Sequence, residues 1–205
     1  MNIGIIGSGH IGGNLGKLLA RKGHKLYYSF SHDEAKLENL ARDAGNESKA
    51  ATPYDAVLCA DVIVLSPPWT QIDEALAKAG DISGKVVIDT TNPYNPDFTI
   101  QELPENESSS EIVAKKIPQS SVVKAFNTLK AQTLLDRTEQ GIAVFYCGDD
   151  PIAKNTVAGL IADCGFVPVD AGTLNEGRLQ QPNTDRYLKE LTKEQAEQLL
   201  GSPAH

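Results

Sequence analysis

A glycine-rich segment directly after the first apolar run of the chain has a spacing that suggests a phosphate site. The run Asn2–Ile6 ends at Gly7, and Gly9 and Gly12 complete a GxGxxG pattern. Gly7 permits a tight turn, Gly9 has no side chain to keep a pyrophosphate off the backbone, and Gly12 lets a following helix lie close to the strand. The pattern predicts a dinucleotide site, and a glycine-rich turn without a ligand is the alternative.

Two residues inside this segment, His10 and Ile11, stand where the following helix begins. Their N–H groups point out of the helix N-terminus, where partial positive charge favours a phosphate. His10 lies at a surface position of that helix start. We therefore expect it to contribute its backbone rather than to act as a catalytic group.

The end of the second predicted strand distinguishes NAD from NADP, because NAD sites usually place an acid there to accept from the ribose 2′-OH. Ser29 is not acidic, and Ser31, His32 and Lys36 follow it. Hydroxyls, an imidazole and an ammonium group suit a 2′-phosphate, which would favour protonated His32. The sequence predicts NADP(H), although Asp33 could repel the phosphate or replace the missing acid.

Side chains suited to holding a ring follow three further predicted strands. The run Ser66-Pro67-Pro68-Trp69 combines a stiff proline pair with the single tryptophan of the chain, which either lies against a cofactor ring or simply packs. Asn92 and Asn127 follow later strands. The amide of Asn127 offers donors and an acceptor to a carboxamide or a flavin-type ring, unless it only forms a turn.

No nucleophile–base pair, paired carboxylates or metal-ligand cluster is evident. Cys59, Cys147 and Cys164 are isolated, and we expect all three to be small buried residues without a disulfide or zinc role. We therefore predict no catalytic side chain and no metal site. Such a site is compatible with hydride transfer, where the cofactor supplies the chemistry and the protein supplies orientation.

Strands and helices alternate along most of the chain. Apolar runs predict strands over 2–6, 25–30, 61–66, 85–89, 122–126, 142–146 and 166–170, with helices between most of them. Alternation of this kind indicates an α/β fold, a Rossmann-type doubly wound and mainly parallel sheet with a short C-terminal α/β extension. Ligands bind such sheets at the carboxyl ends of the strands, where the residues above lie.

Capping patterns and a long loop divide the rest of the chain. Thr52-Pro53 starts one helix, and Ser108 with Glu111 and Thr192 with Gln195 have capping-box spacing. Residues 91–110 predict a loop without regular structure, of a length typical of functional or disordered segments. We predict a nucleotide-binding domain over 1–128 and an extension over 129–205 that packs on it and ends in a polar helical tail.

The composition excludes several classes of protein. The 205 residues include 19 basic and 27 acidic ones, a net charge of −8, which argues against nucleic-acid binding. No apolar run approaches the roughly 20 residues of a membrane span, and no charged leader precedes the first strand. We expect a reduced, cytoplasmic protein that binds no nucleic acid or membrane and acts on a small-molecule redox partner.

An ordered series of motifs resembles a known family. The series comprises Gly7–Gly12 with Gly23-His24, Ser66–Trp69, Val123–Thr128, and Cys147–Asp150 with Val169–Gly172. Over about residues 1–178 it resembles the NADP oxidoreductases that reduce or oxidise the deazaflavin coenzyme F-420. It is also similar to the cytosolic domain of the six-transmembrane metalloreductases, which pass electrons from NADPH to flavin.

The resemblance implies roles for particular residues. Ser8–Ile11 would contact the phosphates, and Ser31, His32 and Lys36 would hold the 2′-phosphate. The residues that would border the ribose and the nicotinamide are Pro68, Trp69, Asn92, Ala125, Phe126 and Asn127. Relatives commonly have arginine at the position of His32, and the polar stretch 180–201 replaces their apolar C-terminal helices.

The leading interpretation is an enzyme that moves a hydride directly between NADPH and F-420, FMN or FAD, without a protein acid or base. An imine, keto or hydroxy-acid reductase is a second interpretation, although only about 50 residues follow Asp150 to build a substrate domain. A non-enzymatic NADP(H)-sensing module is a third. A short chain of this type is also expected to form a homodimer.

Overall fold

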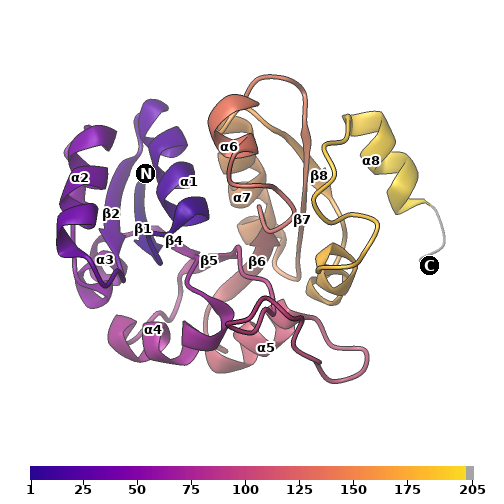
Figure 1. The fold of residues 1–205 in the computed structure, drawn as a ribbon, viewed down its shortest axis with the longest axis horizontal. Helices are drawn as coiled ribbons and strands as arrows, with labels where there is room; N and C mark the ends of the chain where they lie inside the picture. Colours follow the sequence, from indigo (N-terminus) through magenta and orange to yellow (C-terminus); the bar gives the residue numbers. More distant parts are fainter. Residues whose placement is uncertain (202–205) are drawn as a thin grey trace.

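The computed structural model describes residues 1–201, which form one continuous sheet with helices on both faces (Figure 1). The elements in chain order are β1 (Asn2–Ile6), α1 (His10–Arg21), β2 (Lys25–Ser29), α2 (Glu34–Ala44), β3 (Lys49–Ala50), α3 (Pro53–Cys59), β4 (Val62–Leu65), η1 (Trp69–Gln71), α4 (Ile72–Ala79), β5 (Val86–Asp89), α5 (Ser109–Lys116), β6 (Ser121–Ala125), α6 (Thr133–Asp136), β7 (Ala143–Gly148), α7 (Pro151–Asp163), β8 (Val167–Asp170), η2 (Leu174–Gln180) and α8 (Lys193–Leu200). The predicted α/β class is confirmed.

The strand order is β3-β2-β1-β4-β5-β6-β7-β8, with the chain reversing its direction of travel across the sheet after β3. Every neighbouring pair is parallel except β6 and β7, which are antiparallel. The carboxyl ends of β1, β2, β4, β5 and β6 therefore meet at one edge of the sheet. Strands β7 and β8 point the other way, so η2 must cross the sheet face to return the chain to that edge.

Apolar side chains bury both faces of the sheet. One cluster joins α1, α2, α6 and α7 to residues such as Ile5, Val64 and Val123. A second joins α3, α4, α5 and η2 to the alternate residues of the same strands, such as Ile63 and Val122. The alternation follows from the two-residue repeat of a strand, and apolar residues on both faces are typical of central parallel strands.

The predicted helix starts are present. Thr52 accepts a hydrogen bond from the backbone N–H of Asp55 at 3.1 Å, ahead of a proline at the first helical position. Ser108 with Glu111 and Thr192 with Gln195 both form capping boxes. These local contacts fix where α3, α5 and α8 begin.

Some boundaries differ from the prediction. Phe30 and Phe126 have φ of 56° and 62°, and β2 and β6 therefore each end one residue earlier than the apolar runs predict. The short edge strand β3 was not predicted, because Lys49 and Ala50 are exposed and carry no apolar pattern. The 3₁₀ turn η1 precedes α4 and runs directly into it.

The loop between β5 and α5 contains one isolated bridge, between Tyr94 and Ile100, and otherwise lacks regular structure, as predicted. The extension after residue 128 continues the sheet through β7 and β8 (Figure 1), and the division of the chain at that residue stays a prediction. Within residues 1–201, no helix is long and apolar enough to cross a membrane.

Candidate functional site

The glycine segment forms a tight turn between β1 and α1. Gly7 has φ of 101°, and a Cβ there would lie 2.4 Å from the Pro67 backbone nitrogen. A Cβ on Gly12 would lie 2.2 Å from the Gly7 carbonyl oxygen. At Gly9 a Cβ would meet nothing within 4 Å. Two glycines therefore allow close packing of the backbone, while the third leaves open space at the N-terminus of α1.

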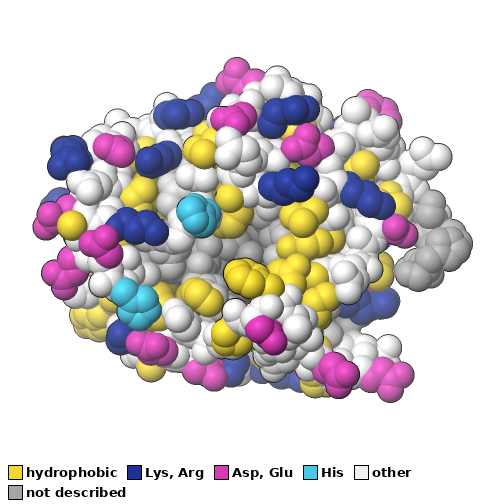
Figure 2. All heavy atoms as spheres, viewed as in Figure 1, with side chains coloured by type: hydrophobic (Ala, Val, Ile, Leu, Met, Phe, Trp, Pro, Cys, Tyr) yellow, Lys and Arg dark blue, Asp and Glu magenta, His cyan; other side chains and the backbone are white. Residues whose placement is uncertain are grey.

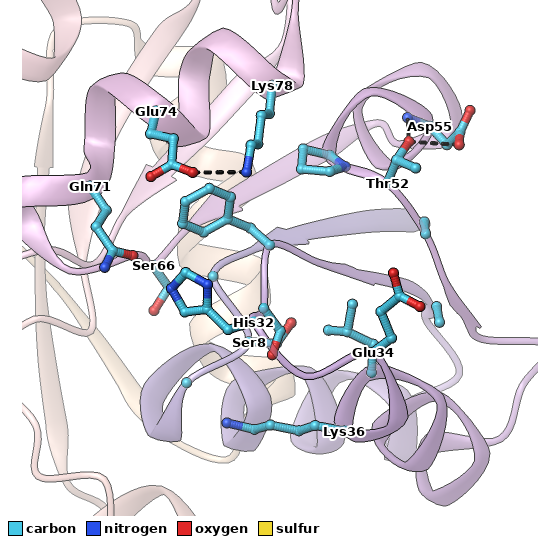
Figure 3. A pocket seen from close by; sticks show the side chains of 18 of the residues that line it. Ser8, His32, Glu34, Lys36, Thr52, Asp55, Ser66, Gln71, Glu74 and Lys78 are labelled. Carbon is cyan, nitrogen blue, oxygen red and sulfur yellow. Dashed lines mark hydrogen bonds and ion pairs between the residues drawn. The ribbon is translucent and has the colours of Figure 1, made fainter.

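That open space belongs to a pocket of about 640 Å³ beyond the carboxyl ends of β1 and β2 (Figure 3). A volume of this size is typical of small-molecule and cofactor sites. The predicted site residues that line the pocket are Gly7, Ser8, Gly9, Ser31, His32, Lys36, Ser66 and Pro68. The structure thus brings the glycine turn and the predicted 2′-phosphate residues into one cavity, while ligand binding itself stays a prediction.

The remaining predicted residues do not line this pocket, and they are His10, Ile11, Gly12, Ser29, Pro67, Trp69, Asn92, Ala125, Phe126 and Asn127. Ser29 is fully buried, and its hydroxyl donates to the Ile5 carbonyl at 2.9 Å. Trp69 is half-buried, and its Nε1 donates to Gln101 Oε1 at 2.8 Å. Trp69 therefore ties the loop of residues 90–108 to η1.

The loop after β2 places Asp33 at the start of α2. Its carboxylate caps α2 by accepting from the backbone N–H of Lys36 at 3.2 Å, and its own N–H donates to Ser31 Oγ at 3.1 Å. Asp33 does not line the pocket, whereas Glu34, the first residue of α2, does. The strand-end acid is therefore a helix cap in this structure.

The pocket wall opposite this loop comes from α4, which the sequence prediction did not include. Glu74 and Lys78 line the cavity, and Lys78 Nζ lies 2.8 Å from Glu74 Oε1. The pKa of Glu74 lies below its usual value, first because Lys78 donates a hydrogen bond to it and then because of the charge of Lys78. The helical spacing of the two residues was visible in the sequence, but their position over the pocket depends on the tertiary fold.

Charges of both signs surround the pocket. Its basic groups are Lys36, Lys78 and His32, and its acidic ones are Glu34, Glu38, Asp55 and Glu74. Figure 2 shows the same mixture over a whole face of the molecule, where acidic and basic side chains alternate around the rim and hydrophobic ones gather near the middle. A phosphate-binding position in this acidic chain must therefore be built from a few local cations and backbone N–H groups.

The ends of β5 and β6 form a second polar region, in which the predicted ring-binding residues contact one another. Asn127 Nδ2 donates to Asn92 Oδ1 at 3.0 Å and to the Gln180 carbonyl at 2.7 Å, and Asn92 Nδ2 donates to the Asn127 carbonyl at 2.9 Å. With both donors used, Asn127 Oδ1 remains a buried acceptor without a partner. The structure thus brings Asn92 and Asn127 together and adds Gln180 of η2, which the sequence prediction missed.

A fully buried ion pair supports this second region. Asp89 and Lys124 are paired residues of β5 and β6, and Lys124 Nζ lies 3.4 Å from Asp89 Oδ2. Lys124 also donates to Ser109 Oγ at 3.0 Å and to the Thr91 carbonyl at 3.1 Å, while Thr91 and Ser110 donate to Asp89. The sequence signal was present as a charged residue within an apolar strand, but its partner could not be chosen without the strand order.

One cysteine expectation is wrong. Cys147 and Cys164 are buried, and burial raises the pKa of both thiols, that of Cys147 to about 12. Cys59 is exposed, because α3 packs on the sheet through Ala56 and Val57 and leaves its last residue outward. Among residues 1–201, no group of three or more His, Cys, Asp or Glu side chains is arranged to hold a metal ion.

Comparison with known families gives a match over the part of the chain that forms the pocket. The model of the family described as "NADP oxidoreductase coenzyme F420-dependent" matches residues 2–93. These residues include the glycine turn, the loop after β2 and helix α4.

Solved structures share the fold over nearly the whole chain. A hypothetical protein of Sinorhizobium meliloti is 33% identical with a TM-score of 0.84, covering 94% of this chain and 96% of that one. A protein of Arthrobacter sp. described as an F420-dependent NADP reductase is 25% identical with a TM-score of 0.77, covering 87% of each chain.

A curated relative is much longer than this chain. Metalloreductase STEAP3 of Rattus norvegicus is 28% identical over 180 residues, which is 86% of this chain and 35% of that protein. The chain therefore spans about a third of the length of this relative.

Proposed function

We propose that the chain transfers a hydride between NADPH and a deazaflavin (coenzyme F-420) or flavin-type acceptor, and the match of residues 2–93 to the coenzyme F420-dependent NADP oxidoreductase model supports this proposal. The observation that carries the proposal is the open space at Gly9, which lies at the N-terminus of α1 and in the wall of a 640 Å³ pocket. A pyrophosphate fits there without displacing a side chain.

Different residues of this chain would bind different parts of the nucleotide. The N–H groups at the start of α1, with Ser8, would bind the pyrophosphate, and Ser31, His32 and Lys36 would bind the 2′-phosphate. When bound, NADPH supplies the hydride. The protein's task is then to hold the two rings face to face and to exclude water between them.

The acceptor half of the proposal rests on the second polar region. Trp69 and Asn92 follow β4 and β5, and Ala125–Asn127 comprises the last residue of β6 and the two residues after it. The nicotinamide of a nucleotide running along this edge would end there. Asp89, the acid at the end of β5, is fully buried and paired with Lys124. This arrangement supports direct transfer without a protein acid or base.

The experiment is oxidation of NADPH by the purified protein with F-420, FMN or FAD, and with an imine and a keto acid as competing substrates. We expect turnover with a deazaflavin or flavin and none with the imine or keto acid. Turnover with the latter would support the reductase alternative. Tight NADPH binding without turnover of any acceptor would support the sensing module instead.

NADP preference and the homodimer are proposals of the same kind. We expect a higher kcat/KM with NADPH than with NADH, and equal values would contradict the preference. Sedimentation equilibrium of the purified protein gives its molar mass in solution, and we expect that of a dimer. A second copy would complete the acceptor side, where the loop tip at Phe98 is 82% exposed.

A further inference from the structure

Helix α4 presents two oppositely charged side chains to the nucleotide pocket. Glu74 and Lys78 are four residues apart, so they lie on one face of the helix, and both line the cavity. They stand across the pocket from His32 and Lys36, which the loop after β2 and the start of α2 provide (Figure 3). The pocket therefore has cations on two walls rather than on one.

Lys78 is held in place by two contacts. Its Nζ lies 2.8 Å from Glu74 Oε1 and 5.6 Å from the centre of the Phe30 ring. Phe30 adopts a left-handed backbone conformation at the end of β2, with φ of 56°. The ammonium group thus rests between a carboxylate and an aromatic face on the pocket wall, where an entering anion can reach it.

Glu74 forms its ion pair with Lys78 of the same helix. The pKa of its carboxyl is lowered mainly by the hydrogen bond from Lys78 and then by the charge of Lys78, with a further contribution from His32 across the pocket. The charge of Lys78 is therefore balanced by a carboxylate of its own helix. The Glu74 and Lys78 side chains remain 50% and 57% exposed. Lys78 can therefore exchange Glu74 for another anion at little cost in desolvation.

We propose that Glu74 is an internal substitute for the 2′-phosphate of NADP(H), and that Lys78 is a further phosphate-binding residue for which Glu74 and the ligand compete. The inference rests on the proposed function, because it takes NADP(H) as the ligand. A phosphate monoester carries about −1.5 to −2 charges near neutral pH, against one on a carboxylate, so it can take the ammonium group from Glu74. Lys78 then strengthens, and Glu74 weakens, recognition of the 2′-phosphate.

The test uses two fragments that differ by that phosphate alone. Adenosine 2′,5′-bisphosphate and adenosine 5′-monophosphate are titrated calorimetrically into the wild type, Lys78→Gln, Glu74→Gln and the double variant at low ionic strength. We expect Lys78→Gln to weaken the bisphosphate by about two- to fivefold and Glu74→Gln to strengthen it by a similar factor. The monophosphate affinity stays constant, and the double variant behaves like Lys78→Gln.

A matched pair in α8 controls for net charge. Lys193 and Glu197 have the same four-residue spacing, a 3.6 Å contact and 54% and 55% exposure, and α8 lies at the opposite end of the molecule (Figure 1). Lys193→Gln and Glu197→Gln make the same charge changes and are expected to leave both affinities unchanged. Equal shifts from the α8 variants would assign the effect to net charge and overturn the inference.

The remaining outcomes separate the inference from the proposed function. If the wild type binds the bisphosphate no more tightly than the monophosphate, the NADP preference and the inference both fail. If the wild type discriminates between the two but Lys78→Gln and Glu74→Gln do not change the ratio, only the inference fails. A weaker bisphosphate affinity in Glu74→Gln would also overturn it.

Discussion

The carboxyl ends of β1 and β2 and those of β5 and β6 lie along the same edge of the sheet, but they are built in opposite ways. The first pair opens into a cavity in which Gly9 leaves free space. The second pair is filled by the protein's own side chains, with Asp89 and Lys124 fully buried and Asn127 only 3% exposed.

The two regions differ in the groups that maintain their shape. The open region is lined by the glycine turn and by side chains of α2, α3 and α4, which leave a cavity of about 640 Å³ between them. The filled region depends on charged and amide groups that satisfy one another and on Gln180, which a later part of the chain supplies. An added side chain should therefore impair the open region, and the loss of hydrogen bonds should impair the filled region.

The largest effect is expected in the filled region, from Lys124→Met. Removing the ammonium group leaves the Asp89 carboxylate buried without its cation, which costs about 3–5 kcal/mol of unfolding free energy. Urea unfolding measures the loss. The double variant Asp89→Asn/Lys124→Met is the control and should lose less than the single one, whereas a loss below about 1 kcal/mol in Lys124→Met would show that the pair is not needed.

In the open region, Gly9→Val should affect binding and not folding. The added side chain meets no protein atom within 4 Å at its Cβ, but it fills the space proposed for the pyrophosphate. We expect NADPH affinity to fall about a hundredfold, or about 2.7 kcal/mol, with little change in unfolding free energy. Gly12→Val is the contrast, since its Cβ would lie 2.2 Å from the Gly7 carbonyl and should destabilise the fold itself. Retained affinity in Gly9→Val would refute this placement of the pyrophosphate.

A smaller effect is expected from Asn127→Ala in the filled region. The change removes the donor of two hydrogen bonds and leaves the Gln180 carbonyl unpaired, at a cost of about 1–3 kcal/mol of unfolding free energy. If the region orients the acceptor, kcat falls while the dissociation constant of NADPH stays unchanged. A change confined to nucleotide affinity would place Asn127 in the nucleotide site instead, and the comparison of the two regions would need revision.

The smallest effect is expected from His32→Arg in the open region. Arginine carries its charge at every physiological pH and can bind a phosphate through two N–H groups. We expect NADPH to bind about two- to fivefold more tightly at neutral pH, measured against NADH as the control ligand. No change would remove His32 from the 2′-phosphate site.

The two regions also differ in how far the sequence predicted them. The glycine turn was predictable because its three glycines and the strand before it are adjacent in the chain. The same holds for the Thr52, Ser108 and Thr192 caps, where donor and acceptor lie within three residues. Local chemistry fixes these features before any tertiary contact forms.

The filled region required information that no local segment holds. Asp89 and Lys124 are 35 residues apart and meet only because β5 and β6 are neighbours in a given register. The antiparallel direction of β7, and hence the path that brings Gln180 to Asn127, is set by packing across the sheet. The position of Glu74 and Lys78 in the pocket wall could not be predicted for the same reason, because a charge pair on a helix does not indicate which cavity it faces.

The order of the two regions along the chain has a consequence for synthesis on the ribosome. Every residue that lines the nucleotide pocket lies between Gly7 and Lys78, whereas the filled region is completed by Gln180. Chains emerge from the ribosome amino end first. The residues that line the pocket therefore leave the ribosome about a hundred residues before Gln180, so the order of synthesis separates the two regions in time.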